Sequence, residues 1–202
     1  MVRVVLPSAG ARHRMHVPMR DDLCSDFRVL DRWRIPVTVE RDEFLRFVRV
    51  FATSGFAPQS RIARALFRIR FAVGRWLGWD GGPPQPIPGC SETTVRERLT
   101  AEERARDQSI SQPLPVPHHD VRPVFVFDDE ALIEVANKTI HALVHLVWRH
   151  HGVEMIVLVK SRAWYSDLYL AAIWPFRHAI VYPAMFRSVA GAWARSEQRA
   201  AS

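Results

Sequence analysis

The sequence predicts an α+β protein, because it contains two kinds of hydrophobic pattern. Runs of β-branched and aromatic residues at 124–127 and 155–160 are typical of strands. Apolar residues at helical spacing between residues 42 and 55, and a long apolar segment after Asp167, are typical of helices. Since the chain has 202 residues, of which 48% are hydrophobic, we expect one domain with a sizeable core.

Composition changes along the chain predict how this domain is organised. Residues 1–23, rich in arginine and histidine, are interpreted as a loose N-terminal arm, and residues 24–202 as the single domain. The stretch 81–123 holds eight of the 14 prolines, which remove backbone donors, so we expect a long loop insert there. Within it, Thr100 and Glu103 have the spacing of a capping box and predict a short helix.

The first part of the domain is predicted to contain short strands followed by two helices. Extended pieces are expected at 27–30 and 37–39, and Asp42 can cap a helix that ends near Gly55. The second helix, at 61–79, carries five arginines and no acidic residue before Asp80. It is either a core-packing helix with a solvated basic face, or a surface that contacts membrane or nucleic acid.

The segment 128–151 is compatible with a helix or with strand structure. Its acidic start, its leucines and alanines and the following Gly152 favour a helix, in which His141 and His145 would lie close enough to share a zinc ion. Its many β-branched residues favour strands, in which the two imidazoles would be roughly 13 Å apart and would line a common surface instead. Structural zinc needs four ligands and no Cys/His cluster supplies the others, so we expect no metal.

The C-terminal part is predicted to form one long, kinked helix from about Asp167 to about Arg195. Pro175 suits a first helical turn or a kink, and Pro183 suits a kink. Tryptophans around this region are expected to pack in the core or at its rim; they are Trp148, Trp164 and Trp193.

The net charge of +7 arises almost wholly from arginine, because Lys138 and Lys160 are the only lysines. A basic protein can bind nucleic acid or an anionic membrane, but no Lys/Arg run exceeds two residues, so we do not expect nucleic acid as a partner. Cys24 and Cys90 have no metal-like spacing and are expected to be free thiols. With neither a secretory nor a transmembrane segment recognisable, a cytoplasmic protein is expected.

An ordered series of short motifs resembles a bacterial family known as domain of unknown function 2867. The matching pieces are Leu66-Phe-Arg-Ile-Arg70, Gly74-Arg-Trp-Leu-Gly-Trp-Asp80, residues 94–99, Asp129-Glu130 with Glu134, Asn137-Lys-Thr-Ile-His141, His145-Leu-Val-Trp148, residues 155–160, Pro175-Phe-Arg-His178 and Val181-Tyr-Pro183. That family looks related to the helix-grip superfamily (SRPBCC), which includes polyketide cyclases, START domains and the birch pollen allergen. The resemblance implies an antiparallel sheet that grips a long C-terminal helix, with residues 128–151 extended. The sequence shows three or four strands after Pro123, against seven in a full helix-grip sheet.

The resemblance also implies a cavity between the sheet and the last helix, and such apolar cavities are common small-molecule sites. The residues expected to line it are Asn137, Thr139, His141, His145, Trp174, Arg177, His178 and Tyr182. Arg177 is either placed to pair with an anionic ligand group or is a structural partner of Glu130 or Glu134. His141 is either a wall of the site or a satisfied core histidine.

Three function classes follow. The first is a binding module for a small hydrophobic or amphipathic molecule, without a cofactor. The second is a cofactor-independent enzyme of cyclase or isomerase type, with His141 or His145 as catalytic acid or base. The third is an interaction protein that uses the basic helix 61–79. The sequence predicts no oligomeric state.

Overall fold

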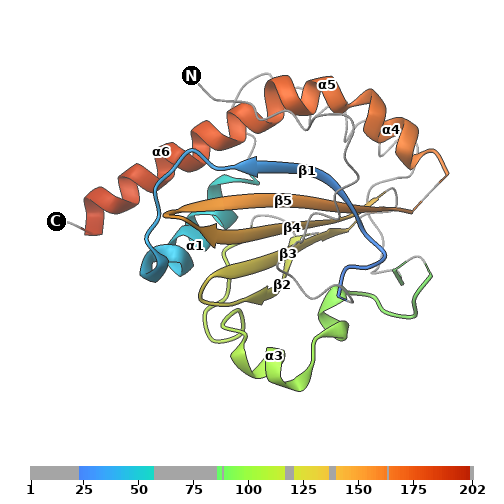
Figure 1. Cartoon of the computed structure of the whole chain (residues 1–202), viewed down its shortest axis with the longest axis horizontal. Coiled ribbons are helices and arrows are strands. Elements are labelled where there is room, and N and C mark those ends of the chain that lie inside the picture. Colours follow the sequence, from blue (N-terminus) through green and yellow to red (C-terminus); the bar gives the residue numbers. More distant parts are fainter. Residues whose placement is uncertain are drawn as a thin grey trace.

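The computed structural model describes residues 23–56, 86–87, 89–116, 121–136, 140–162 and 164–200. In chain order its elements are β1 (Arg28–Arg34), η1 (Arg41–Glu43), α1 (Phe44–Ser54), η2 (Val95–Arg98), α3 (Ala101–Arg106), β2 (Val121–Val126), β3 (Glu130–Ala136), β4 (Ile140–Arg149), β5 (Gly152–Ser161), α4 (Ser166–Ala172), α5 (Trp174–Phe176), the π-helical turn η3 (Arg177–Val181) and α6 (Tyr182–Ala200). The predicted α+β class is confirmed, with a long C-terminal helix beside an antiparallel sheet (Figure 1).

The five strands form one antiparallel sheet in the order β1-β5-β4-β3-β2. The segment 128–151 supplies β3 and β4, which pair along their length from Glu130 opposite Val147 to Ala136 opposite His141. The strand interpretation of this segment is therefore confirmed. The helical alternative is wrong because the β-branched residues pack against cross-strand neighbours, which outweighs the local helix signals.

One face of the sheet, here called the helix face, is covered by α1 and α6. Phe44, Phe47 and Phe51 of α1 meet Phe186 and Trp193 of α6 in one apolar cluster with the sheet. Phe47 and Trp193 contact edge to face, with ring centroids 5.6 Å apart. Burying side chains of this size stabilises the fold by about 1.5–3 kcal/mol each, so this cluster fixes α1 and α6 on the sheet.

The opposite face, here called the loop face, is covered by residues 23–27 and by the described part of the proline-rich loop. Leu23, Phe27, Ile87, Val95 and Leu99 form a second apolar cluster with residues of the sheet. The loop is held in shape by short helices, and the predicted capping box of α3 is present in both directions. The sheet is thus buried on both faces, and each face has its own core.

The C-terminal elements α4, α5, η3 and α6 follow one another along a curved helical rod (Figure 1). The prediction of one kinked helix is close to this arrangement. The irregularity is the π turn, in which the Tyr182 backbone N–H bonds to the carbonyl of Arg177, five residues earlier. It lies between Pro175 and Pro183, and because proline has no N–H to donate, these positions favour a change of helical register.

Some local predictions differ from the structure in the bounds or the presence of an element. Residues 37–39 are not a strand, and the strand expected at 27–30 is longer, running over Arg28–Arg34. Asp42 lies inside η1 instead of capping α1, whose N-cap position is Glu43. The arm at 1–23, apart from Leu23, and the basic helix at 61–79 lie outside the described residues. No described helix is long and apolar enough to cross a membrane.

Candidate functional site

A buried carboxylate on β1 is the centre of a polar cluster beneath the C-terminal rod. The cluster is made possible by an irregularity in β1: Val29 pairs with Leu158, and Asp31 pairs with Val157, so Leu30 is an additional residue in the register. Successive residues of a strand point to opposite faces, and one additional residue reverses which face the following residues occupy. The bulge therefore turns Asp31 to the helix face.

Three side chains of the rod converge on the Asp31 carboxylate. Tyr182 donates its hydroxyl to Oδ2 of Asp31 at 2.6 Å, and Nε of Arg177 lies 2.9 Å from the same oxygen. Nε2 of His178 lies 3.1 Å from Oδ1. Asp31, with these three partners, is here called the Asp31 cluster.

The π turn explains how three residues at spacings of four and five meet one carboxylate. An α-helical turn holds 3.6 residues, so positions five apart face different directions. In a turn closed by a bond between residues five apart, Arg177 and His178 both come about one turn from Tyr182. The wider turn therefore directs all three side chains towards β1.

Aromatic rings surround the polar cluster and lower the local polarity. Trp33 packs against His178 and Tyr182 with ring centroids 5.5 Å and 5.0 Å apart, and Trp174 packs against His178 at 4.7 Å. Burial is the largest effect that raises the pKa of Tyr182 well above its ordinary value, and the negative charge of Asp31 raises this pKa further. The tyrosine is therefore a hydroxyl donor at all physiological pH values.

The Asp31 cluster adjoins a strip of half-buried apolar side chains on the helix face. Val157 is the cross-strand partner of Asp31, and Ala142 and Val135 are partners of each other on β4 and β3. All three side chains are only partly buried, whereas the side chains of the same face beneath Trp193 are fully buried. Nη1 of Arg177 is buried and makes no hydrogen bond to a described residue.

The two predicted histidines lie on the other face of the sheet, next to glutamates of the neighbouring strand. Nε2 of His141 is 3.2 Å from Oε1 of Glu134, and Nε2 of His145 is 3.0 Å from Oε2 of Glu130. Phe27 covers His141 edge-on, with ring centroids 5.0 Å apart. Both histidines are buried, at 1% and 0% exposure, so this pair forms part of the loop-face core.

Glu134 joins this core to the loop above it. Its Oε2 accepts hydrogen bonds from the Thr94 hydroxyl at 2.5 Å and from the Val95 backbone N–H at 3.1 Å. Burial pushes the pKa of Glu134 upwards and is the largest single effect, but the nearby His141 imidazole and the hydrogen bonds from Thr94 and Val95 together outweigh it. The net pKa is lowered, so Glu134 is a buried carboxylate that stays ionised.

The predicted site residues that the structure describes therefore lie on two different faces of the sheet. Trp174, Arg177, His178 and Tyr182 come together at the Asp31 cluster, while His141 and His145 point away from it to the loop face. Asn137 and Thr139 lie outside the described residues. Since the two imidazoles are four residues apart on one strand, they are roughly 13 Å apart and cannot share an ion. No group of three potential metal ligands lies together among the described residues.

Sequence reasoning missed Asp31. One of the two roles predicted for Arg177 was to pair with Glu130 or Glu134. These carboxylates lie on the loop face, and Arg177 pairs with Asp31 instead. A signal was available: Asp31 is an acidic residue between Leu30 and Arg32-Trp33 in a stretch otherwise typical of a strand. A charged residue within a strand that packs in the core calls for a partner.

A second charged cluster is a clamp at the edge of the loop face. Arg98 donates to both carboxylate oxygens of Asp26, at 2.6 and 2.8 Å, and to Glu92 at 2.6 Å. Lys160 also donates to Asp26, at 2.9 Å, and Cys90 lies 3.0 Å from Arg98. The hydrogen bond from Arg98 is the largest effect that holds the pKa of Asp26 far below its ordinary value. This clamp ties three segments of the chain together.

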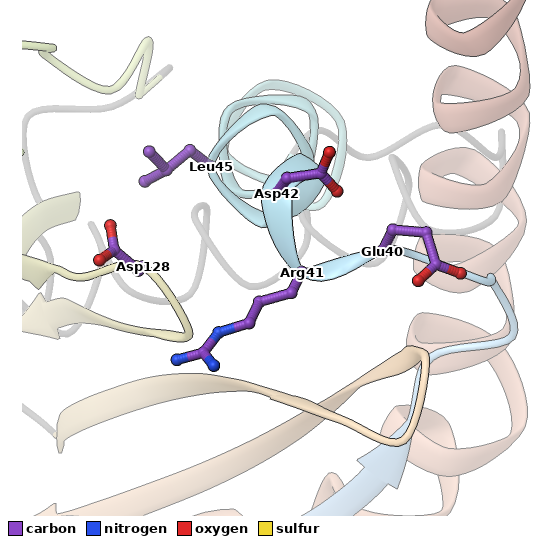
Figure 2. A pocket seen from close by; sticks show the side chains of 5 residues that line it. All are labelled: Glu40, Arg41, Asp42, Leu45 and Asp128. Carbon is purple, nitrogen blue, oxygen red and sulfur yellow. The ribbon is translucent and has the colours of Figure 1, made fainter.

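An open surface hollow of about 440 Å³ lies at the start of α1 (Figure 2). Figure 2 shows Glu40, Arg41, Asp42 and Leu45 beside η1 and α1, and Asp128 on the turn after β2. Arg41 pairs with Asp129 at 3.0 Å, and Glu40 pairs with His151 at 2.9 Å. Of the described residues that line the hollow, four are charged and Leu45 is apolar.

Comparison with known proteins places the chain in a family. Residues 23–184 match the family model described as "Protein of unknown function (DUF2867)". The chain belongs to this family, as the motif series predicted. No curated protein and no solved structure matches the chain. The relation to the helix-grip superfamily stays a prediction, with which the observed order of helices and strands agrees.

Proposed function

We propose that this member of the DUF2867 family binds a small amphipathic molecule between the sheet and the segment α5–η3. Its polar end would contact Arg177 and His178, and its apolar part would lie on the strip formed by Val135, Ala142 and Val157. The observation that carries the proposal is the position of the Asp31 cluster directly beside these half-buried apolar side chains. Ligand sites combine a largely apolar wall with a few convergent polar groups in this way.

The chemistry of the polar end follows from the charges. Asp31 already balances one positive charge of Arg177, so the cluster does not favour a doubly charged anion. The unpaired Nη1 of Arg177 is a buried donor, and leaving such a group without an acceptor costs about 1–3 kcal/mol. A carboxylate or hydroxyl oxygen would relieve that cost. A singly charged carboxylic acid with an apolar chain or ring therefore fits best.

Binding is tested on the purified full chain in two steps. Native mass spectrometry detects a co-purifying small molecule, and calorimetry then compares decanoate with decan-1-ol, which lacks the anion. A charge-assisted hydrogen bond contributes about 1.5–3 kcal/mol and a neutral one about 0.5–1.5 kcal/mol, so decanoate should bind about 5 to 10 times more tightly.

Matched variants decide which residues are responsible. Arg177→Lys keeps the charge but loses Nη1, and should remove most of the preference for decanoate. Trp164→Ala replaces an exposed tryptophan away from the cluster and should leave both affinities unchanged. If neither compound binds, or if Arg177→Lys keeps the full preference, the proposal is wrong.

An enzyme remains the second candidate, because one observation favours it. The Glu134 carboxylate next to the His141 imidazole is the arrangement used to hold a general base in position. However, both side chains are 1% exposed, so a substrate would reach them only through a movement of the loop above. Enzyme chemistry predicts that a substrate protects His141 from diethyl pyrocarbonate; a structural histidine stays unreactive with or without ligand.

A further inference from the structure

Exposed large apolar side chains are concentrated in the segment that runs from Trp164 through α4 and α5. Six such side chains are exposed in the described part of the chain, and four of them fall within residues 164–176. They are Trp164 at 92% exposure, Leu168 at 72%, Trp174 at 51% and Phe176 at 50%. The expectation that Trp164 packs in the core or at its rim is therefore wrong. An exposed group of apolar side chains of this size marks an interaction surface.

Helix α4 has apolar side chains on its outward side as well as on its inward side. Ser166 and Leu170, one turn apart, are buried against the protein. Leu168 and the two alanines at 171 and 172 point outward. The acidic residue of this helix, Asp167, forms an ion pair with Arg28 of β1, which offsets its charge.

The charge of the whole chain favours an anionic partner for this surface. The chain carries a net charge of +7, and the acidic residue of α4, Asp167, is balanced by Arg28. We propose that α4 and α5 dock on an anionic lipid surface, with Trp164, Leu168 and Phe176 entering the interface. Tryptophan favours the boundary between headgroups and acyl chains, and the net positive charge of the chain attracts anionic lipids.

Charge distinguishes this partner from a second copy of the chain. Self-association would bring together two chains that each carry a net charge of +7, whereas an anionic surface compensates that charge. The proposal does not depend on the ligand site, because Trp164 and Leu168 make none of the contacts of the Asp31 cluster. A surface-bound orientation would place the segment α5–η3 next to the lipid.

Vesicle co-sedimentation of the full chain tests the proposal. The chain should bind phosphatidylcholine vesicles that contain about 30% phosphatidylglycerol, and should not bind phosphatidylcholine alone. About 0.5 M salt should weaken this binding. The double variant Trp164→Ser/Leu168→Ser should lose at least about tenfold in affinity, since each side chain would be withdrawn from an apolar contact.

Ile110→Ser is the matched control. Ile110 is 70% exposed, as Leu168 is, but lies in the turn after α3. Its replacement should leave vesicle binding unchanged. The proposal is overturned if the double variant binds as the wild type does, or if anionic vesicles are not bound. It is also overturned if the wild type sediments as a dimer without lipid and the double variant reverts to a monomer.

Discussion

Replacement of Glu134 by glutamine tests how the loop face is held together. In the folded protein this one carboxylate accepts from Thr94 and from the Val95 N–H, and it lies beside His141. Glutamine has the same shape and keeps one acceptor oxygen, but it carries no charge. The replacement therefore isolates the contribution of the negative charge.

The expected magnitude follows from the hydrogen bonds. Bonds to a charged acceptor contribute about 1.5–3 kcal/mol each, against about 0.5–1.5 kcal/mol for neutral ones. Glu134→Gln should thus reduce the free energy of unfolding by about 1–3 kcal/mol at neutral pH. Glu134→Ala leaves the buried Val95 N–H without this acceptor and should cost about 3–5 kcal/mol.

The stability that Glu134 contributes should depend on pH. The pKa of Glu134 is lowered in the folded protein from its ordinary value of 4.5. A group with a lowered folded pKa contributes stability that is present above about pH 4.5 and is lost as the pH falls through the folded pKa. The difference in unfolding free energy between wild type and Glu134→Gln should therefore be largest at neutral pH and should shrink in acid.

Urea unfolding at pH 7 and at about pH 3.5 measures both effects. Glu102→Gln, at an exposed acidic position of α3, is the control and should change the unfolding free energy by less than about 0.5 kcal/mol. A loss of equal size at both pH values would refute the reasoning, because it would mean that Glu134 does not act through its charge.

Three further predictions concern other parts of the structure. Asp31→Asn should lower the unfolding free energy in urea by about 3 kcal/mol or more, since it leaves a buried guanidinium without its anion. His150 and His151 both have positive φ, at 46° and 56°, so His150→Asn/His151→Gly should raise the unfolding free energy by about 0.5–1 kcal/mol. Burial raises the pKa of Cys24 to about 12, so Ellman's reagent at pH 8 should modify Cys90 and leave Cys24 unmodified in the folded chain.

For each of these three predictions, a specific outcome would contradict the reasoning. Asp167→Asn removes an exposed carboxylate and should cost much less than Asp31→Asn; equal costs would contradict the importance of burial. An unchanged stability of the turn variant would mean that the positive φ values carry no strain. Two rapidly reacting thiols in the native protein would show that Cys24 is accessible.

The elements that follow from short-range patterns were predictable. The helical spacing of Phe44, Val48 and Phe51 predicted α1, and these side chains are buried as expected. The capping box at Thr100 predicted the start of α3, because both of its hydrogen bonds are local. Such signals need no knowledge of the rest of the fold.

The composition of the site was only partly predictable, because it depends on which face each strand presents. Trp174, Arg177, His178 and Tyr182 lie together in the structure because they share one stretch of helix, and their role in ligand binding stays a prediction. To predict whether His141 joins these residues, one must know which face of β4 is covered by α6. A sequence pattern of period two does not say which side of a sheet a helix will cover.

Two insertions that no periodic pattern reveals meet at the Asp31 cluster. The bulge at Leu30 adds one residue to β1, and the π turn adds one to the C-terminal rod. Without the bulge, the carboxylate of Asp31 would point to the loop face; without the π turn, Arg177 would face away from β1. Both irregularities weaken regular backbone pairing, and a core needs neither. Because they lie far apart in sequence yet position the same few polar groups, their coincidence favours selection for a site over selection for stability.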